Sequence, residues 1–271
     1  MHNPMRGSVA RLTRPAAPWV VAASMVGAVG LAGMHAANAD GAQAKALFKT
    51  MSDYLAAQKQ ISFDVDTSLE VVTTQKQRIA LASSGKVTLS RPDKLHITRT
   101  GGFSDTEVVY DGKTMTVSDR DSRQYAQLDE PGTIESMVDV LRDKYNKPAP
   151  AADLLTTNMY ARLMPQVVDV DDLGSGVIRG TECDHFAFRM PDVDVQIWIA
   201  HGARPYPCRY VITSTKVDGW PQYTIDVSNW KTGSEVAADG FSFKAPGEFK
   251  KVKLEDLHNA DELPDQFAPS K

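Results

Sequence analysis

Most of the chain after residue 60 alternates apolar and polar residues, which is the pattern of strands that bury one face and leave the other in water. The first run covers residues 61–72, and its apolar positions are Ile61, Phe63, Val65, Leu69 and Val71. Five further runs follow before residue 129, and Asp111-Gly112 between two of them is a strong hairpin signal. The pattern predicts about six strands paired in chain order, as in an antiparallel sheet.

Three stretches have helical periodicity instead. Residues 42–58 place apolar side chains on one face and predict an amphipathic helix that must cover another surface. Two more helices are predicted over residues 133–145, with Thr133 as N-cap, and over residues 151–164, with a break near Thr157-Asn158. A helical pair inserted between strands is expected of a lid that lies in the concavity of a sheet.

Strand periodicity resumes after residue 166. The predicted strands cover residues 166–173, 182–189, 193–200, 207–215 and 222–231, with a last short strand around Phe241 and Phe243. Gly174-Ser175-Gly176 is interpreted as a hairpin turn. The chain from about Lys250 onward is mostly polar and is expected to be weakly ordered. These features predict a single domain over residues 40–250 and a weakly ordered C-terminal tail over residues 251–271.

The first 39 residues have the features of an export signal. Three arginines precede an apolar run from about Trp19 to Gly33, and Ala37-Asn38-Ala39 fits a signal-peptidase site. Residues 1–39 are therefore predicted to be a cleavable signal peptide, with cleavage after Ala39. The apolar run is short for a bilayer span, which needs about 20 residues. An uncleaved membrane anchor is the alternative.

The charge of the mature chain argues against one class of partner. Loss of the three arginines of the signal leaves 27 basic against 34 acidic residues, a formal charge of −7 compared with −4 for the full chain. A mildly acidic protein has no electrostatic attraction to nucleic acid, so no nucleic-acid partner is expected.

Both cysteines, Cys183 and Cys208, lie in a stretch predicted to form three strands. Export would place them where a disulfide can persist. In a flat meander two strand spacings, about 9.5 Å, would separate them, which is beyond the reach of a disulfide. The bond therefore requires that the strand ends, or the loop at residues 202–207, bend inward. Two buried free thiols are the alternative.

Candidate chemistry is sparse. Asp184 and His185 are the first candidates for a catalytic base, but adjacent strand residues point to opposite faces, which favours a structural histidine over a hydrolase. The four histidines of the mature chain show no metal-ligand spacing, so neither a metal nor a cofactor is expected. Trp198, Trp220 and Trp230 are interpreted as packing residues, with Trp198 at a rim or against the first helix.

Five short sequence segments resemble those of known proteins. They are Tyr110-Asp111-Gly112-Lys113-Thr114, Asp143-Lys144-Tyr145, Cys183-Asp184-His185-Phe186-Ala187-Phe188, Gln196-Ile197-Trp198-Ile199 and Arg209-Tyr210-Val211-Ile212-Thr213. They resemble a family of predicted periplasmic proteins of bacteria, which is similar in fold to the lipoprotein carriers LolA and LolB and to LppX. The resemblance implies a mainly β (α+β) fold: a strongly curved antiparallel half-barrel of about eleven strands, with helices covering the apolar concave face.

The amphipathic sheet and the resemblance together imply a periplasmic, non-enzymatic binding or carrier protein for a lipid or lipoprotein acyl chain, with residues 133–164 as a gate. The expected lining is Phe63, Val65, Leu69, Ile79, Leu81, Leu95 and Ile97 from strands, and Met137, Leu141 and Met159 from the gate. A shift of one residue in register would swap the two faces. An envelope sensor or interaction module that contacts a membrane-bound regulator is the alternative, and a hydrolase using His185 or Asp184 is the third hypothesis.

Overall fold

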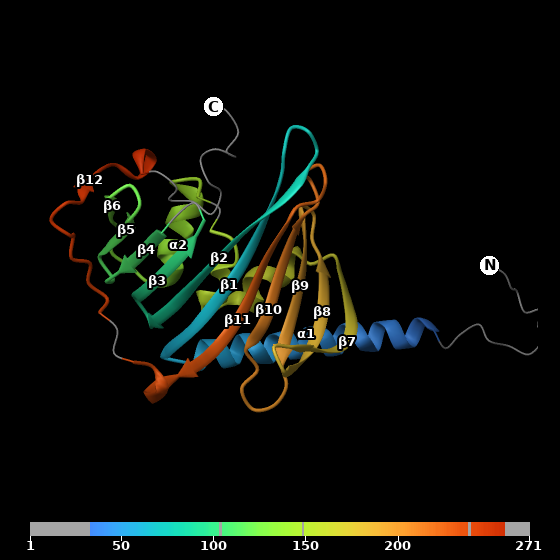
Figure 1. The fold of residues 1–271 in the computed structure, drawn as a ribbon. Coiled ribbons are helices and arrows are strands. Elements are labelled where there is room, and N and C mark those ends of the chain that lie inside the picture. Colours follow the sequence, from blue (N-terminus) through green and yellow to red (C-terminus); the bar gives the residue numbers. More distant parts are fainter. Residues whose placement is uncertain (1–32, 103–104, 148, 238–239, 258–271) are drawn as a thin grey trace, which may run out of the picture.

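A single curved, unclosed sheet of twelve strands forms the body of the protein, with few helices (Figure 1). The computed structural model describes residues 33–102, 105–147, 149–237 and 240–257, with side chains from Gly41 onward. Eleven strands pair antiparallel, and one short strand pairs parallel at an edge. The prediction of a mainly β antiparallel half-barrel of about eleven strands, with helices on the concave face, is confirmed.

Two meanders build the sheet, each with strands that neighbour one another in chain order. The first contains β1 (Gln60–Val72), β2 (Arg78–Ser90), β3 (Lys94–Gly101), β4 (Asp105–Tyr110), β5 (Thr114–Asp119) and β6 (Gln124–Asp129). The second contains β7 (Asp169–Ile178), β8 (Thr181–Arg189), β9 (Val193–Ala200), β10 (Pro207–Ser214) and β11 (Gln222–Thr232). Because β1 pairs with β11, the two meanders join in the middle, and β6 and β7 lie toward opposite edges.

One helix precedes the first strand of the sheet, and two more lie in the connection between β6 and β7. They are α1 (Gly33–Ala57), α2 (Ile134–Asp143) and α3 (Met159–Leu163), with 3-10 turns η1 (Ala152–Leu155), η2 (Met164–Gln166), η3 (Gly233–Glu235) and η4 (Leu254–Asp256). Figure 1 shows α1 crossing the strands of the second meander and α2 beside those of the first. The connection from β6 to β7 must span the width of the sheet, which explains why the helical insertion covers the concave face.

The predicted helix start at Thr133 is confirmed in detail. The backbone N–H of Ser136 donates to the Thr133 hydroxyl at 3.2 Å, and the Thr133 N–H donates to Ser136 Oγ at 2.8 Å. This reciprocal cap satisfies two donors that the first turn of a helix otherwise leaves unpaired. The break expected near Thr157-Asn158 is also present, because η1 ends at Leu155 and α3 begins at Met159.

The disulfide between Cys183 and Cys208 forms, with 7.0 Å between the Cα atoms, and excludes the alternative of two free thiols. Cys183 is opposite Ala200, the last residue of β9, so the bridge passes the end of the intervening strand. Pro207 pairs with Ile199 and Arg209 with Trp198, which leaves Cys208 as the extra residue of a bulge. The strand end and the bulge supply the inward bend that the separation requires.

The hairpin turn predicted at Gly174-Ser175-Gly176 is wrong. These residues lie inside β7, where the register shifts between Asp172 and Ser175, and the turn to β8 comes later, at Arg179-Gly180. Gly174 has φ +81°, a conformation that glycine adopts readily in a bulge as well as in a turn. The same glycine signal therefore marked a bulge within a longer strand.

The chain after β11 also differs from the prediction. No strand forms at Phe241 or Phe243; instead Phe243 packs its ring 5.3 Å from that of Tyr125, and the two-residue strand β12 is at Lys250–Lys251. Leu254 and Leu257 are buried in the core, so the chain expected to be weakly ordered packs through residue 257. The pairing of β12 with β6 and these two apolar side chains place this polar stretch against β6. Residues 258–271 lie outside the described part.

The N-terminal prediction concerns mainly residues that the structure leaves out. Residues 1–32 lie outside the described part, and the predicted cleavage point after Ala39 falls within the backbone of α1, which begins at Gly33 instead of residue 42. Cleavage there stays a prediction. Of the helices that are described, none combines the length and apolar character needed to cross a bilayer.

Replacing both Cys183 and Cys208 with alanine should lower the free energy of unfolding by about 3.5 kcal/mol, because the bond closes a loop of 25 residues. Chemical denaturation of the oxidised protein and the variant measures the difference. A reductant should destabilise the wild type by a similar amount and leave the double variant unchanged. Equal midpoints for wild type and variant would contradict a stabilising role for the bond.

Candidate functional site

The register of the sheet places apolar residues of successive strands opposite one another on the concave face, with the hydrogen-bonded Thr67 and Ser83 hydroxyls between the Phe63 and Leu69 rows. Across the first meander, Phe63 is opposite Val87, which is opposite Ile97, which is in turn opposite Val108. Leu69 is opposite Leu81 on one side and Tyr223 on the other, so the apolar row crosses the junction between the meanders. The seven strand residues of the predicted lining, Phe63, Val65, Leu69, Ile79, Leu81, Leu95 and Ile97, share this face.

Helix α1 fills one part of the concavity completely. Its side chains Phe48, Met51 and Leu55 are buried, and Phe48 packs its ring 5.0 Å from that of Phe188 on β8. Trp230 closes the same region, since it stacks on Phe63 at 5.2 Å and its indole N–H donates to the Tyr54 hydroxyl at 3.2 Å. This part of the face is a packed core rather than a site.

The ten residues of the predicted lining divide into two groups. Four of them are buried between the sheet and the helices: Phe63, Leu95, Met137 and Met159. Val65, Leu69, Ile79, Leu81, Ile97 and Leu141 are only half-buried. Ile79 and Leu81, near the β1–β2 turn, lie outside the buried cluster that the described side chains form. Among the described residues, the apolar face therefore continues beyond the helices that cover it, toward the β1–β2 turn.

A buried arginine ties the gate, residues 133–164, to the rest of the fold. Arg91, between β2 and β3, donates from Nη1 to the Leu155 carbonyl at 2.7 Å and from Nε to the Gln58 carbonyl, just after α1, at 3.2 Å. Its Nη1 also lies 3.6 Å from Glu135 of α2. We call Arg91, Glu135 and Thr157 the clasp. Local sequence patterns did not indicate it, because its members are far apart in the chain.

Electrostatics keep the clasp charged. Burial lowers the pKa of Arg91, and the charge of Glu135 partly offsets this effect. Burial acts to raise the pKa of Glu135, but hydrogen bonds outweigh it, so the pKa lies below its ordinary value. Among these bonds, the Thr157 N–H and hydroxyl donate to Glu135 Oε1 at 2.8 and 2.9 Å. Glu135 is thus held as a carboxylate that joins α2 to the chain before α3.

Asp184 and His185 have different hydrogen-bond partners. His185 stacks on Trp198 with 3.8 Å between ring centroids, and its Nε2 pairs with the Gln196 side chain at 3.1 Å. Asp184 instead pairs with His201 Nε2 at 2.8 Å. Burial lowers the pKa of His185, with the Gln196 hydrogen bond opposing it. These contacts agree with the structural histidine expected from the alternation of strand side chains.

The tryptophans occupy three different settings. The core face of β9 contains Val195 and Ile197, so Trp198 lies on the outer face, and its predicted position against the first helix is wrong. Trp230 packs against α1, whereas Trp220 is 63% exposed. Within the described residues, no group of His, Cys, Asp and Glu side chains is arranged to hold a metal ion.

Several solved structures have a similar course of the chain. LprF from Mycobacterium bovis is 14% identical, with a TM-score of 0.45, over 74% of this chain and 98% of its own. Lipoprotein LppX from Mycobacterium tuberculosis is 13% identical, with a TM-score of 0.38, over 73% and 99%. The MucA/MucB complex of Pseudomonas aeruginosa is 12% identical, with a TM-score of 0.45, over 78% and 63%. None of the curated proteins matches the sequence.

A family model identifies the chain more directly. The model described as "Predicted periplasmic protein (DUF2092)" matches residues 44–255. This range includes all twelve strands, the gate and both cysteines. The chain therefore belongs to the DUF2092 family of predicted periplasmic proteins.

Proposed function

We propose that this protein is a periplasmic, non-enzymatic binding protein that holds a lipid or lipoprotein acyl chain on its concave face. The observation that supports this proposal is the apolar face, which extends past the helices that cover it to the half-buried side chains Leu69, Ile79 and Leu81. Soluble proteins rarely leave a contiguous apolar surface without a partner. A flexible alkyl chain is the simplest occupant, because it needs no polar contacts and can follow a curved surface.

The energetics support such an occupant. Burial of one methylene group contributes about 0.8 kcal/mol, so several methylenes along this face suffice for stable binding. The face is preformed by strand pairing, which reduces the ordering cost of binding. An acyl chain lying there would also remove water from the side chains that the helices leave uncovered.

The gate provides a route into the covered part of the face. Its contacts with the body include those of Arg91 with the Leu155 carbonyl and with Glu135, and the bond from the Tyr160 N–H to Ser52 Oγ at 3.1 Å. Its buried side chains, such as Met137 and Met159, take the place that additional methylenes of a long chain would fill. Displacement of the gate would lengthen the site without breaking any pairing within the sheet.

A periplasmic interaction module is the second candidate function, and the edge strand β7 favours it. The sheet ends at β7, which pairs with β8 on one side. Leu173 and Val177 on this strand are 50% and 69% exposed. An exposed sheet edge can pair with a strand of another protein. Recovery of one inner-membrane protein in stoichiometric amount with the purified protein would favour this function over acyl-chain binding.

Replacing Leu81 with aspartate should weaken the binding of a fluorescent fatty acid at least about tenfold, because it places a carboxylate in the apolar face. The matched control is Ala82→Asp, which adds the same charge on the outer face, where Ala82 is exposed. Equal affinity of the two variants would contradict a site at this end of the face. A wild-type protein that native mass spectrometry finds empty, and that binds no fatty acid, would refute the proposed function.

The gate should loosen in acid. Because the pKa of Glu135 is lowered in the folded protein, its contribution to stability is present above its ordinary value of 4.5 and is lost as the pH falls through the lowered pKa. We expect the dissociation rate of a bound fluorescent fatty acid to rise below about pH 4.5 in the wild type. Glu135→Gln should release the probe faster at neutral pH, with a flatter pH profile.

The control for this experiment is Glu255→Gln, an exposed glutamate on η4, outside the gate. It should keep both the neutral-pH rate and the acid response of the wild type. Identical profiles for Glu135→Gln and the wild type would show that the clasp does not hold the gate.

A further inference from the structure

One end of the sheet gathers exposed apolar side chains. Five large apolar residues of the described chain are exposed: Val168, Leu173, Val177, Val217 and Trp220. Val217 and Trp220 lie in the loop between β10 and β11, and the Val168 N–H donates to the carbonyl of Arg189, the last residue of β8. These three therefore lie at the end of the sheet where β8 and β10 finish and β7 and β11 begin.

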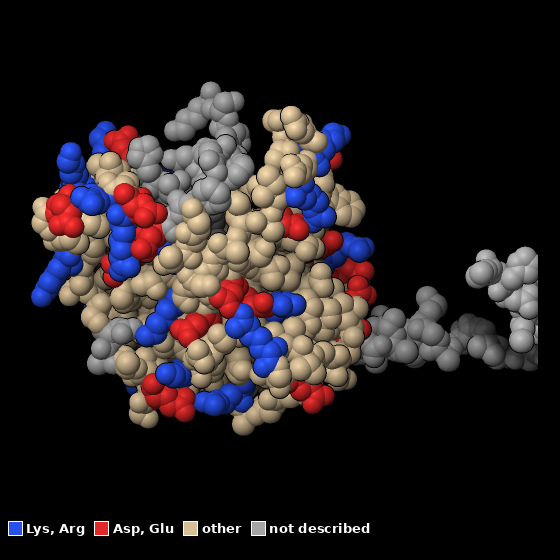
Figure 2. Space-filling model, viewed as in Figure 1, with Lys and Arg blue, Asp and Glu red and all other residues tan. Residues whose placement is uncertain are grey.

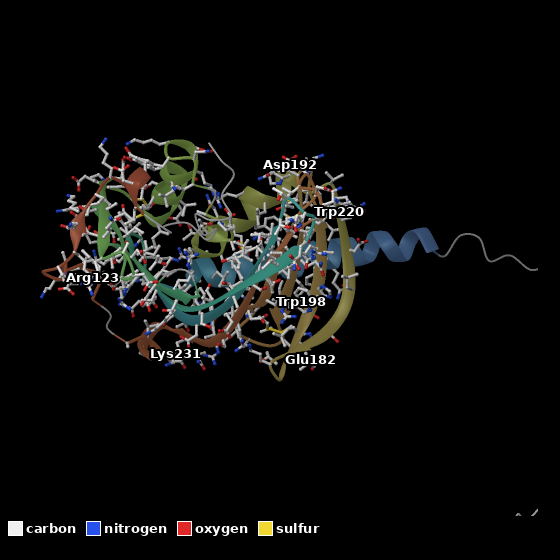
Figure 3. The ribbon with its side chains drawn as sticks, turned by 45° about the horizontal axis from the view of Figure 1, so that its top comes forward. Arg123, Glu182, Asp192, Trp198, Trp220 and Lys231 are labelled. Atoms are coloured by element: carbon white, nitrogen blue, oxygen red, sulfur yellow. A yellow bond between two sulfur atoms is a disulfide. The ribbon has the colours of Figure 1, made fainter. Side chains whose placement is uncertain are left out.

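The same end carries the β1–β2 turn, toward which the apolar concave face is uncovered. We call residues 73–78 and 215–221 together the rim. In Figure 1 the β1–β2 turn projects beyond the rest of the sheet, with the β10–β11 loop beside it. Figure 3 places Trp220 and Asp192 at this end and Glu182 at the other. The rim thus stands next to the uncovered part of the proposed acyl-chain site.

The β10–β11 loop is held in a fixed shape that presents its apolar side chains outward. The Trp220 N–H donates to the Val217 carbonyl at 3.0 Å, and the Thr215 N–H donates to the Asp192 carbonyl at 3.2 Å. Gly219 has φ +80°, and a Cβ there would lie 3.1 Å from a methyl group of Val72, so the loop backbone packs closely on β1. Trp220 is therefore exposed by a rigid loop rather than by a loose one.

The charges at this end balance, and the cations lie next to the exposed apolar side chains. Residues 70–78 and 215–221, with Asp192 beside them, contain Lys76, Arg78 and Lys216 against Glu70, Asp192 and Asp218. Glu70 pairs with Arg78 and Asp218 with Lys76 at 3.6 Å, whereas Lys216 is exposed. The space-filling view shows a mostly uncharged projection with a few charged side chains beside it (Figure 2).

A hollow of about 380 Å³ opens beside the exposed indole. Its lining is Arg78, Thr213, Gly219, Trp220 and Gln222. Arg78 pairs with Glu70, and the Gln222 amide donates to the Thr213 hydroxyl at 3.1 Å. The remaining N–H groups of the Arg78 guanidinium can donate to the phosphate of a phospholipid headgroup. Tryptophan itself favours the boundary between the headgroups and the acyl chains of a bilayer.

We propose that the rim docks on the surface of an anionic phospholipid bilayer, with Trp220 and Val217 entering the interface and Arg78 and Lys216 facing the headgroups. This inference rests on the proposed function in one respect: docking would bring the uncovered end of the acyl-chain site to the membrane. The docking surface itself is defined by the rim alone, so vesicle binding can be measured without any bound acyl chain.

The test uses protein purified from the periplasm and vesicles of phosphatidylethanolamine with about one third phosphatidylglycerol. We expect the wild type to float with these vesicles, and lipids brominated near the headgroup to quench its tryptophan fluorescence. The double variant Trp220→Ser, Val217→Ser should bind the vesicles about tenfold more weakly and lose most of the quenching, because two apolar anchors are gone.

The matched control is Val177→Ser, which removes an apolar side chain that is 69% exposed at the opposite end of β7. It should bind vesicles as the wild type does. Thermal unfolding of all variants shows that each is folded. A wild type that does not bind the vesicles, or a rim variant that binds as well as Val177→Ser, would overturn the proposal.

Fatty-acid binding measured in parallel without vesicles separates this proposal from the proposed function. The rim variant should bind a fluorescent fatty acid with wild-type affinity, because the rim side chains lie outside the concave face. Vesicle binding by a wild type that takes up no fatty acid would refute the proposed function and leave docking supported. Fatty-acid binding without vesicle binding would refute docking alone.

Discussion

The antiparallel ladder between β1 and β11 is the constraint on which the rest of the structure depends. Eight residue pairs, from Ile61–Thr232 to Leu69–Tyr223, join a meander from the first half of the chain to one from the second half. Each meander alone would leave an apolar face in water. Joined, they form one curved face large enough to enclose helices and, in our proposal, a ligand. The ladder also places β6 and β7 toward opposite edges, which forces the connecting gate across the concavity.

The two ends of the strands then acquire different properties. At one end the disulfide between Cys183 and Cys208 ties β8 to β10 past the end of β9. At the other end are the β1–β2 turn and the β10–β11 loop, where the apolar face is uncovered and Trp220 is exposed. The two ends of the sheet therefore differ: one is cross-linked, and the other exposes apolar side chains.

Polar pairs between neighbouring strands stabilise the outer face of the sheet. Arg209 donates two hydrogen bonds to Asp226, at 2.5 and 2.9 Å, and its guanidinium lies 5.7 Å from the Trp198 ring. Asp66, opposite Asp226 on β1, pairs with the Ser84 hydroxyl and with Arg179, and these partners hold its pKa below the ordinary value. These contacts link both meanders on the side away from the proposed site.

The sequence by itself determined most of the local elements. The run predicted over residues 61–72 lies within β1, and Thr133 caps its helix, because alternation and capping are properties of neighbouring residues. The same alternation put the seven strand residues of the predicted lining on one face. Only the tertiary structure decided the β1–β11 pairing, the clasp around Arg91, the bulge at Gly174 and the exposure of Trp220. These depend on contacts between residues far apart in the chain, about which local periodicity carries no information.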